Sequence, residues 1–259
     1  MPVPGNQRES RSMAGRVVLV TGGSRGIGRA IAQDLGKAGA EVAVGYVHDR
    51  KAAESLVSEL IGAGAPGRAF RADLSRPPEV RRLLARVGSW RGRLDGLVTC
   101  GGIYRGATVE GTPASEWEEV LRVDLIGSFE TVREALPLLR AGRDPAVVTI
   151  SSVLGSHPAI GGVAYQAAKA GVEQMTRVLA RELAPAVRVN GVAPGFIRTD
   201  LNRGGHEDPH YHRFVSEGTP LGRWGEPEDV GPAVRFLLGP GSRNVTGVVL
   251  GVDGGIPLG

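Results

Sequence analysis

The chain has 259 residues, of which 41% are hydrophobic and 22% are charged, enough for one α/β domain with a full core. Its formal net charge is only +4, and no long basic run, aromatic platform or helix-turn-helix pattern occurs, which argues against a nucleic-acid binder. No apolar run is long enough for a membrane span, and the single Cys100 rules out an internal disulfide framework and fits a reducing, cytoplasmic location. Residues 1–13 are polar without the apolar centre of a signal peptide, so we expect a flexible arm before a single domain over 14–259.

The first pattern in the chain is a strand, a glycine-rich turn and a helix. The apolar run Arg16–Val20 predicts a buried parallel strand, and it leads directly into the sequence TGGSRGIG at 21–28. Helical spacing follows and ends near Gly36. Glycines let the backbone approach a pyrophosphate, whose charge the N-terminal N–H groups of a helix stabilise. This order of elements therefore predicts dinucleotide binding.

The end of the second predicted strand, 41–46, bears on the choice of cofactor. An acid there would bind the 2′-hydroxyl of NAD, but here the first acid, Asp49, comes late. Arg25, His48 and Arg50 could instead form a cationic corner for a 2′-phosphate. We therefore expect NADP (NADPH), with NAD possible. The alternative is that these charges belong to a solvated helix start.

Three further strand–helix units are expected. Strands over 68–74, 94–100 and 146–152 alternate with helices over 50–61, 79–87 and 115–139. Asp73 follows the carboxyl end of its strand, where it could meet an adenine or cap the next helix. Asp124 lies among apolar residues in the long helix, where a carboxylate is costly unless it is paired or functional.

The last segments complete a doubly wound parallel sheet. A helix over 163–183, a strand over 187–193, a helix over 227–238 and a strand over 245–252 are expected. Strict alternation predicts an α/β Rossmann fold of about seven strands in a single domain, with every carboxyl-end loop at one edge. The polar segment 200–219 holds three histidines, but their irregular spacing does not favour a metal site.

A tyrosine and a lysine share one face of the predicted helix 163–183. Tyr165 and Lys169 lie four residues apart, so their side chains are one turn apart. A nearby ammonium favours a phenolate, so we expect the pKa of Tyr165 to fall toward working pH and the phenol to transfer a proton. Taken alone, the pair is more often part of an ordinary amphipathic helix.

Together these motifs resemble the short-chain dehydrogenase/reductase family, most of all its 3-oxoacyl-acyl-carrier-protein reductases and polyketide ketoreductases. The resemblance covers about residues 14–258. It rests on the glycine motif at 21–28, Ser152 thirteen positions before Tyr165, Lys169, the stretch Asn190–Gly195 and the stretch Val252–Gly255.

The resemblance implies a role for each site residue. Tyr165 would be the general acid on the ketone oxygen, Lys169 would lower its pKa and bind the nicotinamide ribose, and Ser152 would hydrogen-bond the substrate carbonyl. Ser151 competes with Ser152, but the spacing favours Ser152. Asp124 completes the expected catalytic set. Tyr165 and Lys169 also belong to the expected cofactor-binding set, whose other members are Gly22, Ser24, Arg25, Gly26, Ile27, Gly28, Tyr46, His48, Asp73, Leu74, Cys100, Gly101, Gly102, Val123, Pro194, Gly195, Ile197 and Thr199.

The sequence differs from the family pattern at two places in the expected site. Thr99–Gly102 stands where the family has Asn-Asn-Ala-Gly, and Asp124 stands where it has an Asn that anchors a proton-relay water. An ionised Asp124 would stabilise protonated Lys169 and change the pH profile, so we expect an active enzyme with an altered relay.

The resemblance implies NADPH-dependent reduction of a carrier-bound or free 3-oxoacyl or polyketide-like ketone. An alcohol or sugar dehydrogenase is the alternative within the fold, and a cofactor-binding protein without turnover is the alternative of another class. Residues 200–219 would form the variable substrate lid. The helices over 116–139 and 163–183 correspond to the family's dimer contact, and the family expectation is a homotetramer.

Overall fold

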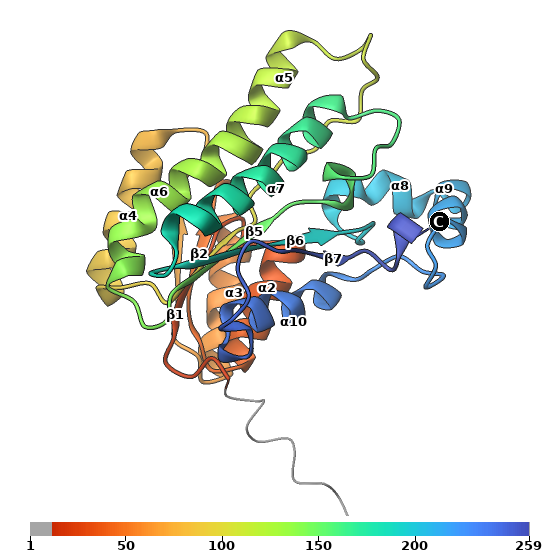
Figure 1. Ribbon diagram of the computed structural model, residues 1–259. Helices are drawn as coiled ribbons and strands as arrows, with labels where there is room; N and C mark the ends of the chain where they lie inside the picture. The colour runs from red at the N-terminus through yellow and green to blue at the C-terminus, as the bar shows by residue number, and fades with distance from the viewer. Residues whose placement is uncertain (1–11, 259) are drawn as a thin grey trace, which may run out of the picture.

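Seven parallel strands form one sheet in the order β3-β2-β1-β4-β5-β6-β7 (Figure 1). The computed structural model describes residues 12–258. The strands are β1 (Val17–Val20), β2 (Glu41–Tyr46), β3 (Gly67–Arg71), β4 (Gly96–Thr99), β5 (Ala146–Ile150), β6 (Arg188–Pro194) and β7 (Val249–Val252). The order reverses between β1 and β4, which is where open α/β sheets bind ligands beyond their carboxyl ends. The predicted fold class is confirmed.

Helices cover both faces of the sheet (Figure 1). α4 (Pro77–Arg91), α6 (Gly127–Arg140) and α7 (Val163–Leu183) lie on one face, and α2 (Gly26–Lys37), α3 (Arg50–Gly62) and α10 (Pro227–Leu238) on the other. Alternate residues of β1 serve the two layers: Val18 and Val20 join the cluster of Ile31, whereas Val17 and Leu19 join the cluster of Leu139. Because both faces are buried, the strand is apolar throughout.

The long helix predicted over 115–139 is regular only at its ends. It begins as α5 (Ala114–Val120), continues through a π-helical segment, Leu121–Ile126, and ends as α6. A π turn adds a residue to the helical circuit and often marks a functional site. This segment contains Asp124, whose side chain is fully buried.

Three predicted boundaries are corrected. β3 ends at Arg71, not near residue 74, because Asp73 accepts hydrogen bonds from the backbone and hydroxyl of Ser75 and turns the chain. β7 begins at Val249, after Gly247 with a φ of +81°. Met13, which we assigned to the arm, is buried in the core, and the rest of that arm, apart from Ser12, lies outside the described residues.

The predicted lid is helical and lies beyond the ends of β6 and β7 (Figure 1). It comprises α8 (Arg203–Glu207) and α9 (Pro209–Glu217). Trp224, which is almost fully buried, packs against Phe196 after β6 and against Tyr211 and His212 of α9. Within residues 12–258, none of the helices has the length and apolar character needed to cross a membrane.

Candidate active site

A cleft of about 340 Å³ lies at the carboxyl edge of the sheet, where the strand order reverses. The glycine turn after β1, the end of β2, the loops after β3, β4, β5 and β6, and the start of α7 all line it. Every member of the expected catalytic and cofactor-binding sets lines this cleft, but Arg50 of the expected cationic corner does not. The fold thus brings together the glycine turn, the serine, the tyrosine–lysine pair and Pro194–Gly195, whereas the stretch Val252–Gly255 lies outside this cleft.

The glycine turn has the space and the free donors that a diphosphate requires. Gly22 and Gly26 have φ values of +63° and +51°, which side chains rarely adopt. A Cβ at Gly28 would collide with the carbonyl of Gly22, so α2 can approach the turn only with glycine there. No side chain caps α2, and its first turn holds no acid, so its N-terminal N–H groups and dipole favour an anion.

The acid nearest the end of β2, Asp49, lines the cleft and is engaged by the start of α3. Asp49 accepts a hydrogen bond from the Ala52 N–H as the N-cap of α3. Arg50 forms an ion pair with Glu54, 2.7 Å away on α3, and does not line the cleft. Arg25 and His48 do line it. Two of the three predicted cations therefore meet at this corner, and the third does not.

Asp73 lines the cleft but does not cap α4, whose N-cap is Arg76. Its Oδ1 accepts from Ser75, and its Oδ2 lies 3.4 Å from the guanidinium of Arg76. The capping alternative is therefore wrong, while a contact with adenine stays a prediction.

Lys169 lines the end of the cleft away from the glycine turn. It is 6% exposed, and its ammonium donates a hydrogen bond of 3.2 Å to the carbonyl of Ile150. The ammonium lies 5.4 Å from the ring centroid of Tyr165, one turn earlier on α7. The two serines at the end of β5 differ: Ser151 donates to the carbonyl of Lys169, whereas Ser152 lies close enough to Tyr165 to affect its pKa. The geometry favours Ser152 as the serine that faces a substrate.

Asp124 forms an ion pair with Lys169 inside the protein. Its Oδ2 lies 3.3 Å from Nζ of Lys169, and its Oδ1 accepts a hydrogen bond of 2.9 Å from the Ile103 N–H. The loop after β4 closes tightly over this carboxylate, because a Cβ at Gly102 would lie 2.8 Å from Oδ2. The carboxylate of Asp124, which the sequence placed among apolar residues at a cost in free energy, is therefore paired.

Comparison with known proteins identifies the family of the chain. Residues 22–257 match a family model described as enoyl-(acyl carrier protein) reductase. The chain is 39% identical over 254 residues to the rhamnolipids biosynthesis 3-oxoacyl-[acyl-carrier-protein] reductase of Pseudomonas aeruginosa, covering 95% of this chain and 98% of that protein. It is 35% identical to the 3-oxoacyl-[acyl-carrier-protein] reductase of Synechocystis sp., covering 95% and 99%. The chain belongs to the short-chain dehydrogenase/reductase family.

Solved structures of this short-chain dehydrogenase/reductase family superimpose closely. The Pseudomonas aeruginosa RhlG/NADP active-site complex has a TM-score of 0.90 and 37% identity, covering 96% of this chain and 98% of that one. A gluconate 5-dehydrogenase from Burkholderia cenocepacia, in complex with NADP and tartrate, has a TM-score of 0.92 and 29% identity, covering 98% and 100%. Proteins named as reductases and as dehydrogenases thus share this fold.

The expected direction of the Tyr165 pKa shift is wrong for this short-chain dehydrogenase/reductase. Burial raises the pKa of Tyr165, and the Lys169 ammonium offsets this only in part. The Asp124 carboxylate raises the pKa of Tyr165 further. Burial lowers the pKa of Lys169, but Asp124 and Tyr165 outweigh burial and raise it. Lys169 therefore acts on the phenol in the expected direction but does not set the net shift.

Sequence reasoning missed three residues that position this site. The Ile103 N–H orients Asp124, and no local sequence signal marks it. Asn202 forms a capping box with Thr199 and donates to the carbonyl of Ile197, and the pattern of a threonine followed three residues later by an amide could have identified it. Trp224 packs against the lid, and no sequence signal marks this role, because Phe196 and His212, which it contacts, are not its neighbours in the sequence.

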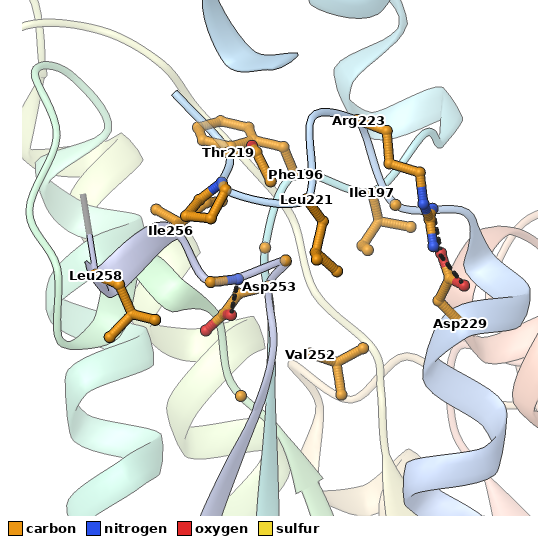
Figure 2. Close-up of a pocket in the computed structure, with 16 residues that line it drawn as sticks. Phe196, Ile197, Thr219, Leu221, Arg223, Asp229, Val252, Asp253, Ile256 and Leu258 are labelled. Carbon is orange, nitrogen blue, oxygen red and sulfur yellow. Dashed lines mark hydrogen bonds and ion pairs between the residues drawn. The ribbon is translucent and has the colours of Figure 1, made fainter. Parts of the chain in front are cut away.

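A second cavity, of about 520 Å³, lies beside the first and contains none of the predicted catalytic residues (Figure 2). Gly195 and Ile197 line both cavities. Its charged groups already have partners: Arg223 binds Asp229, and Asp253 accepts from the backbone of Gly255 (Figure 2). The predicted catalytic residues therefore all lie in the first cleft and not in this second cavity. Within residues 12–258, no group of three His, Cys, Asp or Glu side chains could hold a metal ion.

Proposed function

We propose that the chain catalyses the NADPH-dependent reduction of a 3-oxoacyl or polyketide-like ketone to a secondary alcohol. The observation that carries the proposal is the meeting of Ser152, Tyr165 and Lys169 at one end of a cleft whose other end is an uncapped glycine turn. The printed names of the relatives support it, since two of them are 3-oxoacyl-[acyl-carrier-protein] reductases. The ketone is free or linked to a carrier protein.

NADP fits the residues of the cleft. The uncapped start of α2 holds the diphosphate, and Arg25 with His48 meets the 2′-phosphate. Asp49, the acid nearest the end of β2, lines the cleft, but its carboxylate is held as the N-cap of α3 by the Ala52 N–H. The NADP complex of the Pseudomonas aeruginosa relative supports this choice. Asp73 is the proposed contact to adenine, and Pro194, Gly195, Ile197 and Thr199 line the nicotinamide end.

The mechanism follows from three side chains. NADPH, when bound, supplies the hydride. The Ser152 hydroxyl donates a hydrogen bond to the carbonyl oxygen, where negative charge develops. Tyr165 donates its proton to that oxygen, and the Lys169 ammonium stabilises the phenolate that remains. Lys169 is buried and Tyr165 is half-buried, and the low exposure of this pair strengthens these interactions.

An oxidation of sugars or alcohols is the competing function, because a gluconate 5-dehydrogenase has the same fold. The lid favours the ketone proposal. Phe214 is 71% exposed on α9 and stacks on Tyr211, and Leu201 lines the cleft. Exposed aromatic and apolar side chains favour an acyl or polyketide chain over a polyol.

The test is a substrate panel assayed with a catalytic variant. NADPH consumption is measured with 3-ketoesters of increasing chain length and, in reverse, NADP reduction is measured with gluconate. Tyr165→Phe should lower kcat by about 10²- to 10⁴-fold while NADPH binding, followed by fluorescence, persists. Tyr104→Phe is the matched control, since Tyr104 packs edge-on against Tyr165 at 5.2 Å between ring centroids.

Either of two outcomes would contradict the proposal. One is that Tyr165→Phe reduces ketones as fast as the parent. The other is tight NADPH binding with no turnover on any ketone, which would leave a cofactor-binding protein without turnover.

The proposal extends to assembly and location. A homotetramer is supported by two separate sets of exposed apolar side chains, one on the face of α6 and α7 and one on α10 and β7. A reducing cytoplasm suits the single, unpaired Cys100.

A further inference from the structure

We propose that Asp124 is a positioning residue with two effects. It keeps the Lys169 ammonium charged, and its own negative charge offsets the effect of that ammonium on Tyr165, so that Tyr165 remains a proton donor to higher pH. This inference rests on the proposed ketone reduction and gives that reaction its pH dependence. It concerns a carboxylate that stands where the family has a neutral amide.

Burial raises the pKa of the Asp124 carboxyl group, and two contacts oppose burial by favouring the ionised form. Oδ1 accepts from the Ile103 N–H, and Oδ2 faces the Lys169 ammonium at 3.3 Å. Oδ2 is fully buried and makes no other hydrogen bond, so Lys169 is its one partner among the described residues. A backbone N–H and an ammonium both stabilise the charged form of an acid.

Lys169 needs such a partner more than an exposed lysine would. Its ammonium is buried, and a single carbonyl, that of Ile150, accepts a hydrogen bond from it. Burial disfavours the ammonium, and removing one member of a buried ion pair is strongly unfavourable. The raised pKa of Lys169, to which Asp124 contributes most among its charged neighbours, agrees with this.

The other ionisable groups around Asp124 do not replace it. From α7, Lys169 and Tyr165 face it. From the loop after β4 come Tyr104, which packs on Tyr165, and Cys100, whose pKa burial raises to about 12, so its thiol stays neutral. On its own helical segment, Arg122 is exposed. The cluster of Asp124, Lys169 and neutral Tyr165 therefore has no net charge.

This balance has a consequence for turnover. When Tyr165 gives its proton to the ketone oxygen, the phenolate that forms lies near the Asp124 carboxylate. With asparagine at position 124, the phenolate would lie near a neutral amide. The carboxylate makes that phenolate more basic, so it recovers a proton from solvent up to higher pH. Reduction should accordingly persist into alkaline solution.

The test compares the parent with Asp124→Asn. The alkaline decline of ketone reduction should move to lower pH in the variant, because a neutral amide no longer opposes the phenolate. The phenolate absorbance of Tyr165, with Tyr165→Phe as the blank, should titrate at lower pH too. Asp34→Asn is the matched control, since it removes a carboxylate from an ion pair with Arg235 away from the cleft and should shift neither curve. Asp124→Ser is the second variant if the amide perturbs folding, checked by circular dichroism.

The two proposals fail in different ways. Unchanged curves in Asp124→Asn would overturn the role of Asp124 while ketone reduction stands. Curves moved to higher pH would overturn its countering of charge at Tyr165, because they would mean that Lys169 loses its own charge without Asp124. A parent that reduces no ketone would overturn the proposed function, whereas the absorbance titration would still measure the effect of Asp124 on Tyr165.

Discussion

The two neighbouring serines after β5, Ser151 and Ser152, have different hydrogen-bond partners. Ser151 donates to the carbonyl of Lys169 at 3.0 Å, and this contact ties β5 to α7. Ser152 accepts from the Leu154 N–H and keeps its own hydroxyl proton available toward Tyr165. Two adjacent residues of the same type can therefore divide structure and chemistry between them.

We expect Ser152→Ala to lower kcat for ketone reduction by about 10²- to 10³-fold, because the developing oxyanion loses its donor. Ser151→Ala should cost about 1 kcal/mol of unfolding free energy and change kcat far less. Steady-state kinetics and urea unfolding of the two variants measure both effects. A larger loss of kcat in Ser151→Ala would reverse the assignment.

We expect Arg25 to contribute most of the preference for NADPH over NADH. Arg25→Ala should raise KM for NADPH by about 10- to 100-fold, the value of a charge-assisted contact to a phosphate, and leave KM for NADH nearly unchanged. Arg50→Ala is the control, since Arg50 is paired with Glu54 outside the cleft. Equal effects of Arg25→Ala on the two cofactors would argue against a 2′-phosphate at this corner.

At the scale of elements, a buried carboxylate joins the amino-terminal ends of the central strands of the sheet. Asp95, just before β4, is fully buried and accepts from the N–H of Val17 at 2.8 Å and of Arg143 at 2.6 Å. Arg93 lies 3.2 Å from it. One side chain thus joins the starts of β1 and β4 to the loop before β5.

Asp95→Ala should lower the free energy of unfolding by about 3–5 kcal/mol, because two backbone donors and a guanidinium lose their partner. Urea denaturation measures the loss. Glu54→Ala, which breaks an exposed pair on α3, should change stability by less than about 1 kcal/mol. A small effect of Asp95→Ala would mean that water replaces the carboxylate.

How far the sequence predicted the structure depends on the range of the interactions involved. Strand and helix periodicity is local, so the alternation, the helix Val163–Leu183 and the meeting of the motifs at one edge were predictable. The π-helical segment around Asp124 was not, because the helical pattern continues through it. The pKa of Tyr165 was misjudged because the spacing to Lys169 is visible in a sequence but the degree of burial is not.

At the scale of the whole molecule, two sets of exposed apolar side chains lie on different elements. Phe129 of α6 and Val178 of α7 belong to the first set, and Phe236 of α10 and Leu250 of β7 to the second. Among the strands of residues 12–258, β7 pairs with β6 alone, so its other edge is open within this part of the chain. Open edges invite pairing with another chain. Two surfaces that each pair with a copy of themselves would generate a tetramer with two kinds of interface.

The assembly prediction follows from this division. Light scattering after gel filtration should give the parent a mass about four times the 27.1 kDa of one chain. Phe129→Glu with Val178→Glu should yield dimers, because charge is placed in the first interface, and Phe236→Glu with Leu250→Glu should yield dimers through the second. All four changes together should leave monomers. Ile61→Glu is the control, since Ile61 is exposed on α3 outside both sets, and it should leave the tetramer intact. A monomeric parent, or dissociation by Ile61→Glu, would show that these surfaces do not mediate assembly.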